Sequence, residues 1–115
     1  MARVVAVFDD LLLGSNVLGA LRAAGHDASL AGPSVESVDA DVLIVDLGSA
    51  GFDGVALIER LRASGELDEV ATLGVYSHAH HDVKLRAESA GYDLVVPRSR
   101  MMREGAALVA KLAQA

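Results

Sequence analysis

Acidic side chains follow two apolar runs of the sequence, at the point where each run ends. Asp9 and Asp10 come after the run that begins at Arg3, and Asp46 follows the run DVLIV. Three carboxylates in one crevice would repel each other unless a cation offset their charge. Mg²⁺ prefers oxygen ligands, so two or three carboxylates with one backbone carbonyl would suffice to hold it. With such an ion in place, Asp46 could act as a nucleophile toward phosphorus and form an aspartyl phosphate. The alternative is that these aspartates are solvated turn residues.

The elements that must position these carboxylates alternate between short apolar runs and segments of helical spacing. The apolar runs predict strands at 3–8, 27–31, 41–45, 70–76 and 94–96. Helical spacing predicts helices at 15–24, 54–64, 80–90 and 99–114, and Ser34 as a helix cap with Glu36 in the first turn predicts a short helix at 34–39. This alternation is typical of a doubly wound, flavodoxin-like α/β fold with five helices and a five-stranded parallel sheet in the order 2-1-3-4-5. In that order the ends of the first and third strands line one crevice, where Asp9, Asp10 and Asp46 would meet.

The composition excludes several classes of protein. The chain has 115 residues, 52% hydrophobic and 23% charged, so residues 1–115 are predicted to form one packed domain. A net charge of −6 argues against a nucleic-acid-binding surface. The chain has no cysteine, which excludes disulfides, thiolate metal sites and thiol nucleophiles. No export signal and no apolar run of about 18 residues is found, so we expect a cytoplasmic protein without a membrane span.

Over nearly its whole length the sequence resembles the receiver domains of two-component response regulators, the chemotaxis regulator type included. The stretch VFDD at 7–10 resembles the family's acidic pair after the first strand. VDLGSAGFDG at 45–54 resembles the end of the phosphoacceptor strand and its loop. VYSHAHHD at 75–82 places Ser77 where the family has its switch serine or threonine, and AESAGYDLVV at 87–96 is similar to the run that leads into the fifth strand.

The resemblance implies a role for each candidate site residue. Asp46 would accept the phosphoryl group, Ser77 would hydrogen-bond a phosphoryl oxygen, and Arg98 falls on the family's strand-5 lysine. The implied Mg²⁺ ligands are Asp9, Asp10, Asp46 and the backbone carbonyl of Gly48. A sensor histidine kinase or a phosphotransfer protein would donate the phosphoryl group from a phosphohistidine. The chain would be primarily a signalling protein, and its only enzymatic activity would be Mg²⁺-dependent phosphorylation and dephosphorylation of its own aspartate. A downstream effector protein would bind it, no output domain is expected, and a homodimer is also compatible.

Several positions depart from the family pattern. Arg98 presents a planar guanidinium instead of a compact ammonium, and it could pair with a phosphoryl group or point into solvent. Val95 stands at the family's aromatic switch position, and Pro97 precedes Arg98 where the family has a proline after the lysine. Arg98 and Val95, together with the apolar leucines at 11–13, favour a second hypothesis, a pseudo-receiver that acts as a phosphorylation-independent protein-interaction module. A third hypothesis, a small-ligand module of flavodoxin-like fold, is disfavoured because carboxylates stand where a phosphate-bearing cofactor needs backbone donors.

Two further clusters lie beside the predicted site. The three leucines at 11–13 follow the acidic pair. They could form an apolar lip over the site or a docking patch, and at least one is expected to pack beneath the first helix. The histidines at 78, 80 and 81 have no companion cysteine, so a solvated loop or helix cap is favoured over a metal site. His26 stands alone in a predicted turn and has no assigned role.

Overall fold

Five parallel strands form the centre of the computed structural model, which describes residues 2–114. The strands are β1 (Arg3–Val7), β2 (Asp27–Ala31), β3 (Val42–Asp46), β4 (Ala71–Tyr76) and β5 (Leu94–Pro97). They pair in the order β2-β1-β3-β4-β5, and every pairing is parallel. The predicted sheet, its strand order and its doubly wound class are confirmed.

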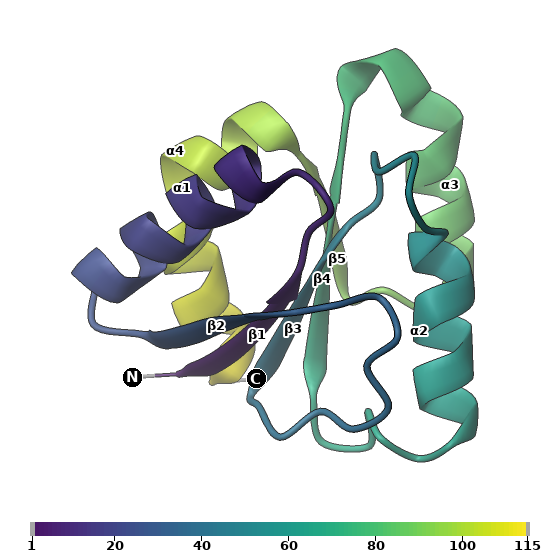
Figure 1. Cartoon of the computed structure of the whole chain (residues 1–115), viewed down its shortest axis with the longest axis horizontal. Helices are drawn as coiled ribbons and strands as arrows, with labels where there is room; N and C mark the ends of the chain where they lie inside the picture. The colour runs from purple at the N-terminus through teal and green to yellow at the C-terminus, as the bar shows by residue number, and fades with distance from the viewer. Residues whose placement is uncertain (1, 115) are drawn as a thin grey trace.

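Helices cover both faces of this sheet (Figure 1). Within residues 2–114 there are four α-helices: α1 (Leu11–Ala23), α2 (Gly54–Ala63), α3 (His81–Ala90) and α4 (Arg98–Ala113). A short 3₁₀ turn, η1 (His78–His80), precedes α3. Helices α1 and α4 lie on one face, and α2 and α3 lie on the other. None of the helices in the described part of the chain is long and apolar enough to cross a membrane.

Two cores form because successive strand side chains point to opposite faces of the sheet. In β3, Val42 and Ile44 pack toward α1 and α4, whereas Leu43 and Val45 pack toward α2 and α3. All four side chains are fully buried. Burial on both faces explains why this strand is a continuous apolar run, and a one-residue slip would exchange its two faces. The position of Asp46 at the carboxyl end of β3 is therefore fixed by the core.

The predicted helix at 34–39 is wrong, and with it the prediction of five helices. Residues 32–41 connect β2 to β3 without a helix. Val35 and Val38 pack into the core on the α2–α3 side, and the Val38 backbone N–H donates to Oε1 of Glu66 at 3.1 Å. A helix of six residues makes few hydrogen bonds for the cost of its first turn. Packing of two β-branched side chains therefore decides the conformation of this segment.

Candidate functional site

Asp46 ends β3 with a side chain that is fully buried. Its Oδ1 accepts a hydrogen bond from the Gly48 backbone N–H at 3.0 Å and lies 3.5 Å from Nη2 of Arg98. Its Oδ2 is also buried and has no hydrogen-bond partner among the described residues. A buried carboxylate with an unpaired oxygen costs free energy. Stability alone does not explain an aspartate at this position, which makes it the candidate functional residue.

Leu47, the residue after Asp46, packs between two glycines. A Cβ on Gly54 would lie 2.8 Å from Cδ2 of Leu47, and a Cβ on Gly74 would lie 2.6 Å from its Cδ1. The Leu47 backbone N–H donates to the carbonyl oxygen of Val75 at 2.7 Å. A side chain at either position would force Leu47 to shift, so the two glycines leave the space that Leu47 fills just after the carboxylate.

Arg98 reaches the same edge of the sheet from the first residue of α4. Pro97, the last residue of β5, pairs with Tyr76 at the end of β4, and this register brings Arg98 toward Asp46. The Arg98 side chain is 37% exposed, and its Nε is buried without a hydrogen-bond partner among residues 2–114. Of the two alternatives that the sequence left for Arg98, the structure shows the guanidinium turned toward the site.

Gly48 and Ser77 complete the surroundings of the Asp46 carboxylate. A Cβ placed on Gly48 would lie 3.1 Å from Nη2 of Arg98, 3.5 Å from Oδ1 of Asp46 and 3.6 Å from Cβ of Ser77. Four of the residues singled out in the sequence therefore meet at one point of the carboxyl edge.

The two N-terminal aspartates make other contacts. Asp10 caps α1, because its Oδ1 accepts hydrogen bonds from the backbone N–H groups of Leu12 (3.0 Å) and Leu13 (3.1 Å). The carboxylate of Asp9 lies against Gly51, where a Cβ would be 2.5 Å from Oδ2. In the chain from 2 to 114, no group of three or more carboxylate or imidazole side chains stands close enough together to hold a metal ion. The predicted Mg²⁺ ligand set is not assembled in this conformation and stays a prediction.

The donor chemistry of these residues nevertheless suits a hard cation. The predicted ligands are all oxygen atoms, as Mg²⁺ prefers. The buried Oδ2 of Asp46 has no partner among the described residues and can accept a cation. In the present conformation, the positive charge beside Asp46 comes from the Arg98 guanidinium. A metal ion at this carboxylate would therefore meet an arginine that already pairs with it.

The cap formed by Asp10 starts α1 at Leu11, four residues earlier than the sequence predicted. This places the three leucines in the first turn of the helix. Leu13 packs against the core, as expected for at least one of them, whereas Leu11 and Leu12 are 70% and 74% exposed.

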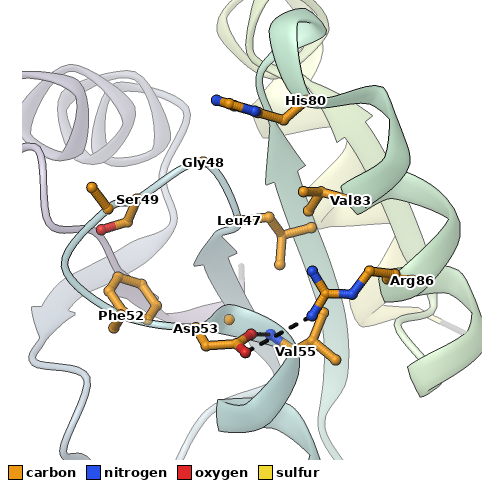
Figure 2. Close-up of a pocket in the computed structure, with 11 residues that line it drawn as sticks. Leu47, Gly48, Ser49, Phe52, Asp53, Val55, His80, Val83 and Arg86 are labelled. Atoms are coloured by element: carbon orange, nitrogen blue, oxygen red, sulfur yellow. Dashed lines mark hydrogen bonds and ion pairs between the residues drawn. The ribbon is translucent and has the colours of Figure 1, made fainter.

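A groove of about 360 Å³ lies beside the site, between the loop after β3 and helix α3 (Figure 2). Leu47 and Val83 give it an apolar wall, and His80 stands at one end. At the other end, Arg86 approaches Asp53 with a nitrogen-to-oxygen distance of 3.9 Å. The groove therefore connects the loop that carries the candidate site with α3.

The three neighbouring histidines form the η1 turn and the start of α3, and all three are exposed. The ring of Tyr76 makes edge contacts with the rings of His78 and His81, at centroid distances of 5.9 Å and 6.2 Å. These contacts join the end of β4 to the turn that follows Ser77.

Sequence reasoning missed the role of His26. Its Nδ1 accepts a hydrogen bond from the Ala2 backbone N–H at 3.2 Å, and its Nε2 lies 3.2 Å from the carbonyl oxygen of Ala106. Because Nδ1 accepts, Nε2 carries the proton and donates to Ala106. The ring thus joins the start of β1 to α4, over a sequence separation that no local spacing reveals.

Tyr92 is a second residue whose role the sequence did not reveal. Its buried hydroxyl donates to the carbonyl oxygen of Gly54 at 2.8 Å, which links the start of β5 to the start of α2. Burial raises the pKa of Tyr92 far above its ordinary value, the nearby Asp53 carboxylate raises the pKa further, and Arg62 partly opposes both effects. This hydroxyl is a fixed donor at neutral pH.

The chain is similar to known proteins in structure and not in sequence. No family model and no curated protein sequence matches the chain. A putative response regulator from Chloroflexus aurantiacus J-10-fl superposes with a TM-score of 0.83 at 20% identity, covering 99% of this chain and 98% of that one. The receiver domain of the Francisella response regulator 1452 gives 0.81 at 16% identity, with 99% and 98% covered.

A third similar structure carries ligands. It is a response regulator from Burkholderia pseudomallei with a phosphorylated aspartic acid, a calcium ion and citrate, and it superposes with a TM-score of 0.76 at 16% identity, covering 99% of this chain and 69% of that one. The chain therefore has the fold of response regulator receiver domains.

Proposed function

We propose that this chain is a receiver domain that accepts a phosphoryl group on Asp46 and signals through contacts with partner proteins. The observation that carries the proposal is the fully buried Asp46 carboxylate at the end of β3, with one oxygen unpartnered among the described residues and a guanidinium beside the other. The fold supports it, because in open α/β sheets ligands bind at the carboxyl ends of the strands beside the topological switch point. The phosphorylated aspartate and calcium ion of the Burkholderia protein support the same chemistry.

The proposed transfer needs little covalent chemistry from the protein. An oxygen of Asp46 forms a bond to phosphorus while the phosphorus–nitrogen bond of a donor phosphohistidine breaks. The electron pair of that bond stays on the leaving nitrogen, and neutral imidazole leaves when its other nitrogen carries a proton. The Arg98 guanidinium and the Gly48 N–H lie beside Oδ1 of Asp46, where they can stabilise negative charge on the transferred group.

Mg²⁺ is part of this proposal. It would be held by the carboxylates of Asp9, Asp10 and Asp46 with the Gly48 carbonyl, and when bound it would neutralise charge on the phosphoryl oxygens. In this proposal residues 1–115 act as one domain, a sensor histidine kinase or phosphotransfer protein supplies the phosphoryl group, and an effector protein reads the result.

The test uses a small phosphodonor. Wild-type protein and the Asp46→Asn variant are incubated with Mg²⁺ and acetyl phosphate, and intact mass is measured by mass spectrometry. We expect the wild type to gain one phosphoryl group, the variant to gain none, and hydroxylamine to remove the modification because it cleaves acyl phosphates. A wild type that never gains mass, or a variant that gains as much, would refute phosphorylation of Asp46.

One observation favours a second candidate, the phosphorylation-independent interaction module. The three carboxylates are not gathered into a metal-binding group within residues 2–114, and Asp46 already has a cationic partner. This module would retain the acidic residues without using them for transfer. NMR separates the two: Mg²⁺ should shift the signals of Asp9, Asp10 and Asp46 saturably in a receiver and leave them unchanged in the module.

A further inference from the structure

Asp46 is closed off from solvent by the groups packed around it. The side chain is 0% exposed, and Oδ2 has no accessible surface. A phosphoryl donor must touch a carboxylate oxygen, so this conformation is not competent for transfer. Arg98 is the partly exposed member of the ion pair: its Nη2 lies 3.5 Å from Oδ1 of the buried carboxylate, and its side chain is 37% exposed, so it extends from Asp46 to the surface.

Gly48 makes the approach of Arg98 possible. A Cβ at this position would lie 3.1 Å from Nη2 of Arg98, which is closer than nine in ten real Cβ contacts. The backbone does not itself require glycine here, since the glycines with positive φ among residues 2–114 are Gly25, Gly65 and Gly91. A Cβ at position 48 would instead press on the guanidinium, which would have to shift by a few tenths of an ångström away from the carboxylate.

The closed arrangement is only weakly held. The distance of 3.5 Å from Nη2 of Arg98 to Oδ1 of Asp46 is long compared with about 2.8 Å for a strong charge-assisted hydrogen bond. Within the described chain, Nε of Arg98 and Oδ2 of Asp46 are both buried without a partner. Unpaired buried polar groups cost free energy, and opening the pair lets water reach these two atoms. That gain offsets part of the free energy lost when the ion pair breaks.

We propose that Gly48 and Arg98 form a gate over Asp46. Gly48 leaves the space in which the guanidinium covers and neutralises the carboxylate. The carboxylate becomes accessible when Arg98 shifts off its oxygen, to a position from which the guanidinium can still face the incoming phosphoryl group. Gly48 is then a positioning residue that acts through Arg98. The inference rests on the proposed function only because it takes Asp46 as the phosphoryl acceptor. Whether Arg98 covers the Asp46 carboxylate can be measured without phosphate or metal.

The experiment measures how fast a water-soluble carbodiimide and an amine label the Asp46 carboxylate in the folded, metal-free protein. Labelling is quantified by mass spectrometry of the peptide that contains Asp46, with the exposed Asp9 and Asp10 as internal references. The variants are Gly48→Ala, Arg98→Gln and the double variant. Gly32→Ala is the matched control, because a Cβ on this loop glycine would have no neighbour within 4 Å.

We expect labelling of Asp46 to be up to about fivefold faster in Gly48→Ala and in Arg98→Gln, because loss of one weak ion pair changes an opening equilibrium by at most roughly that factor. The double variant should label no faster than the faster single variant, since both changes remove the same cover. Gly32→Ala should label like the wild type. If Gly48→Ala does not fold by circular dichroism, Arg98→Gln alone decides the outcome.

Equal labelling of Asp46 in the wild type and Arg98→Gln would overturn the gate, and so would rate increases that multiply in the double variant. The outcome is separate from that of the phosphorylation test. A wild type that gains no phosphoryl group, with labelling that still responds to Arg98→Gln, would leave the gate intact and refute only the proposed transfer.

Discussion

The Asp46→Asn substitution should make the protein more stable. It removes a buried charge, whose effective desolvation penalty is several kcal/mol. The pair with Arg98 opposes that penalty by at most about 1 kcal/mol, because the contact is 3.5 Å long and its cationic partner is 37% exposed. The hydrogen bond from Gly48 survives in the amide but loses its charge assistance, which costs a further ~1 kcal/mol. The new amide N–H group costs about 1 kcal/mol if it stays unpaired. The three opposing contributions sum to about 3 kcal/mol, so a desolvation penalty of about 4 kcal/mol leaves the variant more stable by about 1 kcal/mol.

The measurement is urea unfolding followed by circular dichroism, comparing midpoints at equal slope. The matched control is Asp93→Asn, the same chemical change at a carboxylate with well-formed partners. Oδ2 of Asp93 accepts hydrogen bonds from the backbone N–H (2.8 Å) and the hydroxyl (3.1 Å) of Thr72, so this variant should lose up to about 1 kcal/mol. If Asp46→Asn loses as much stability as Asp93→Asn or more, the buried carboxylate is well compensated and the reasoning is refuted.

Three further variants test contacts away from the acceptor. Burial, and then the charge of Asp53, raise the pKa of Tyr92 above 10.0. The protonated hydroxyl therefore stabilises the folded protein in full below about pH 10, and this contribution is lost as the pH rises further. Above that pH the urea midpoint of the wild type should fall relative to that of Tyr92→Phe. Thr72→Val removes the hydroxyl that donates to Oδ2 of Asp93 and accepts its backbone N–H at 3.0 Å, so unfolding free energy should drop by about 2 kcal/mol, and an unchanged midpoint would contradict this network. His26→Ala removes the ring that joins β1 to α4, and a thermal melt should show a loss of about 1 to 2 kcal/mol, whereas no loss would mean that the ring's hydrogen bonds contribute nothing.

The sheet was predictable because its strands are buried on both faces. Such strands appear in a sequence as continuous apolar runs, and DVLIV is the clearest of them. Parallel strands in turn require crossover connections, so the alternation of runs and helical segments restricts the order of strands to few solutions. The position of Asp46 and Ser77 at the same edge follows directly from that order. The fold and the location of the candidate site could therefore be predicted from the sequence.

The direction of side chains was not predictable in the same way. Nothing local to Asp10 shows that its carboxylate caps α1 through the Leu12 and Leu13 N–H groups. Nor does the sequence show that Arg98 turns toward Asp46, because that depends on space left by Gly48, a residue 50 positions away in the chain. The segment 34–39 was mistaken for a helix because its cap signal is local, whereas packing of its valines against the core decides its path.

The tight fit of Leu47 between Gly54 and Gly74 has a mechanical consequence. The two methyl groups of Leu47 fill the space that a Cβ on Gly54 or Gly74 would take, so packing on both sides holds the residue that follows Asp46. The two groups that contact the Asp46 carboxylate lie outside the strand, in the loop after β3 (Gly48) and at the start of α4 (Arg98), so a change at the carboxylate should alter these contacts before it moves the strand. A larger side chain at either glycine should displace Leu47, and with it the end of β3 that carries the carboxylate.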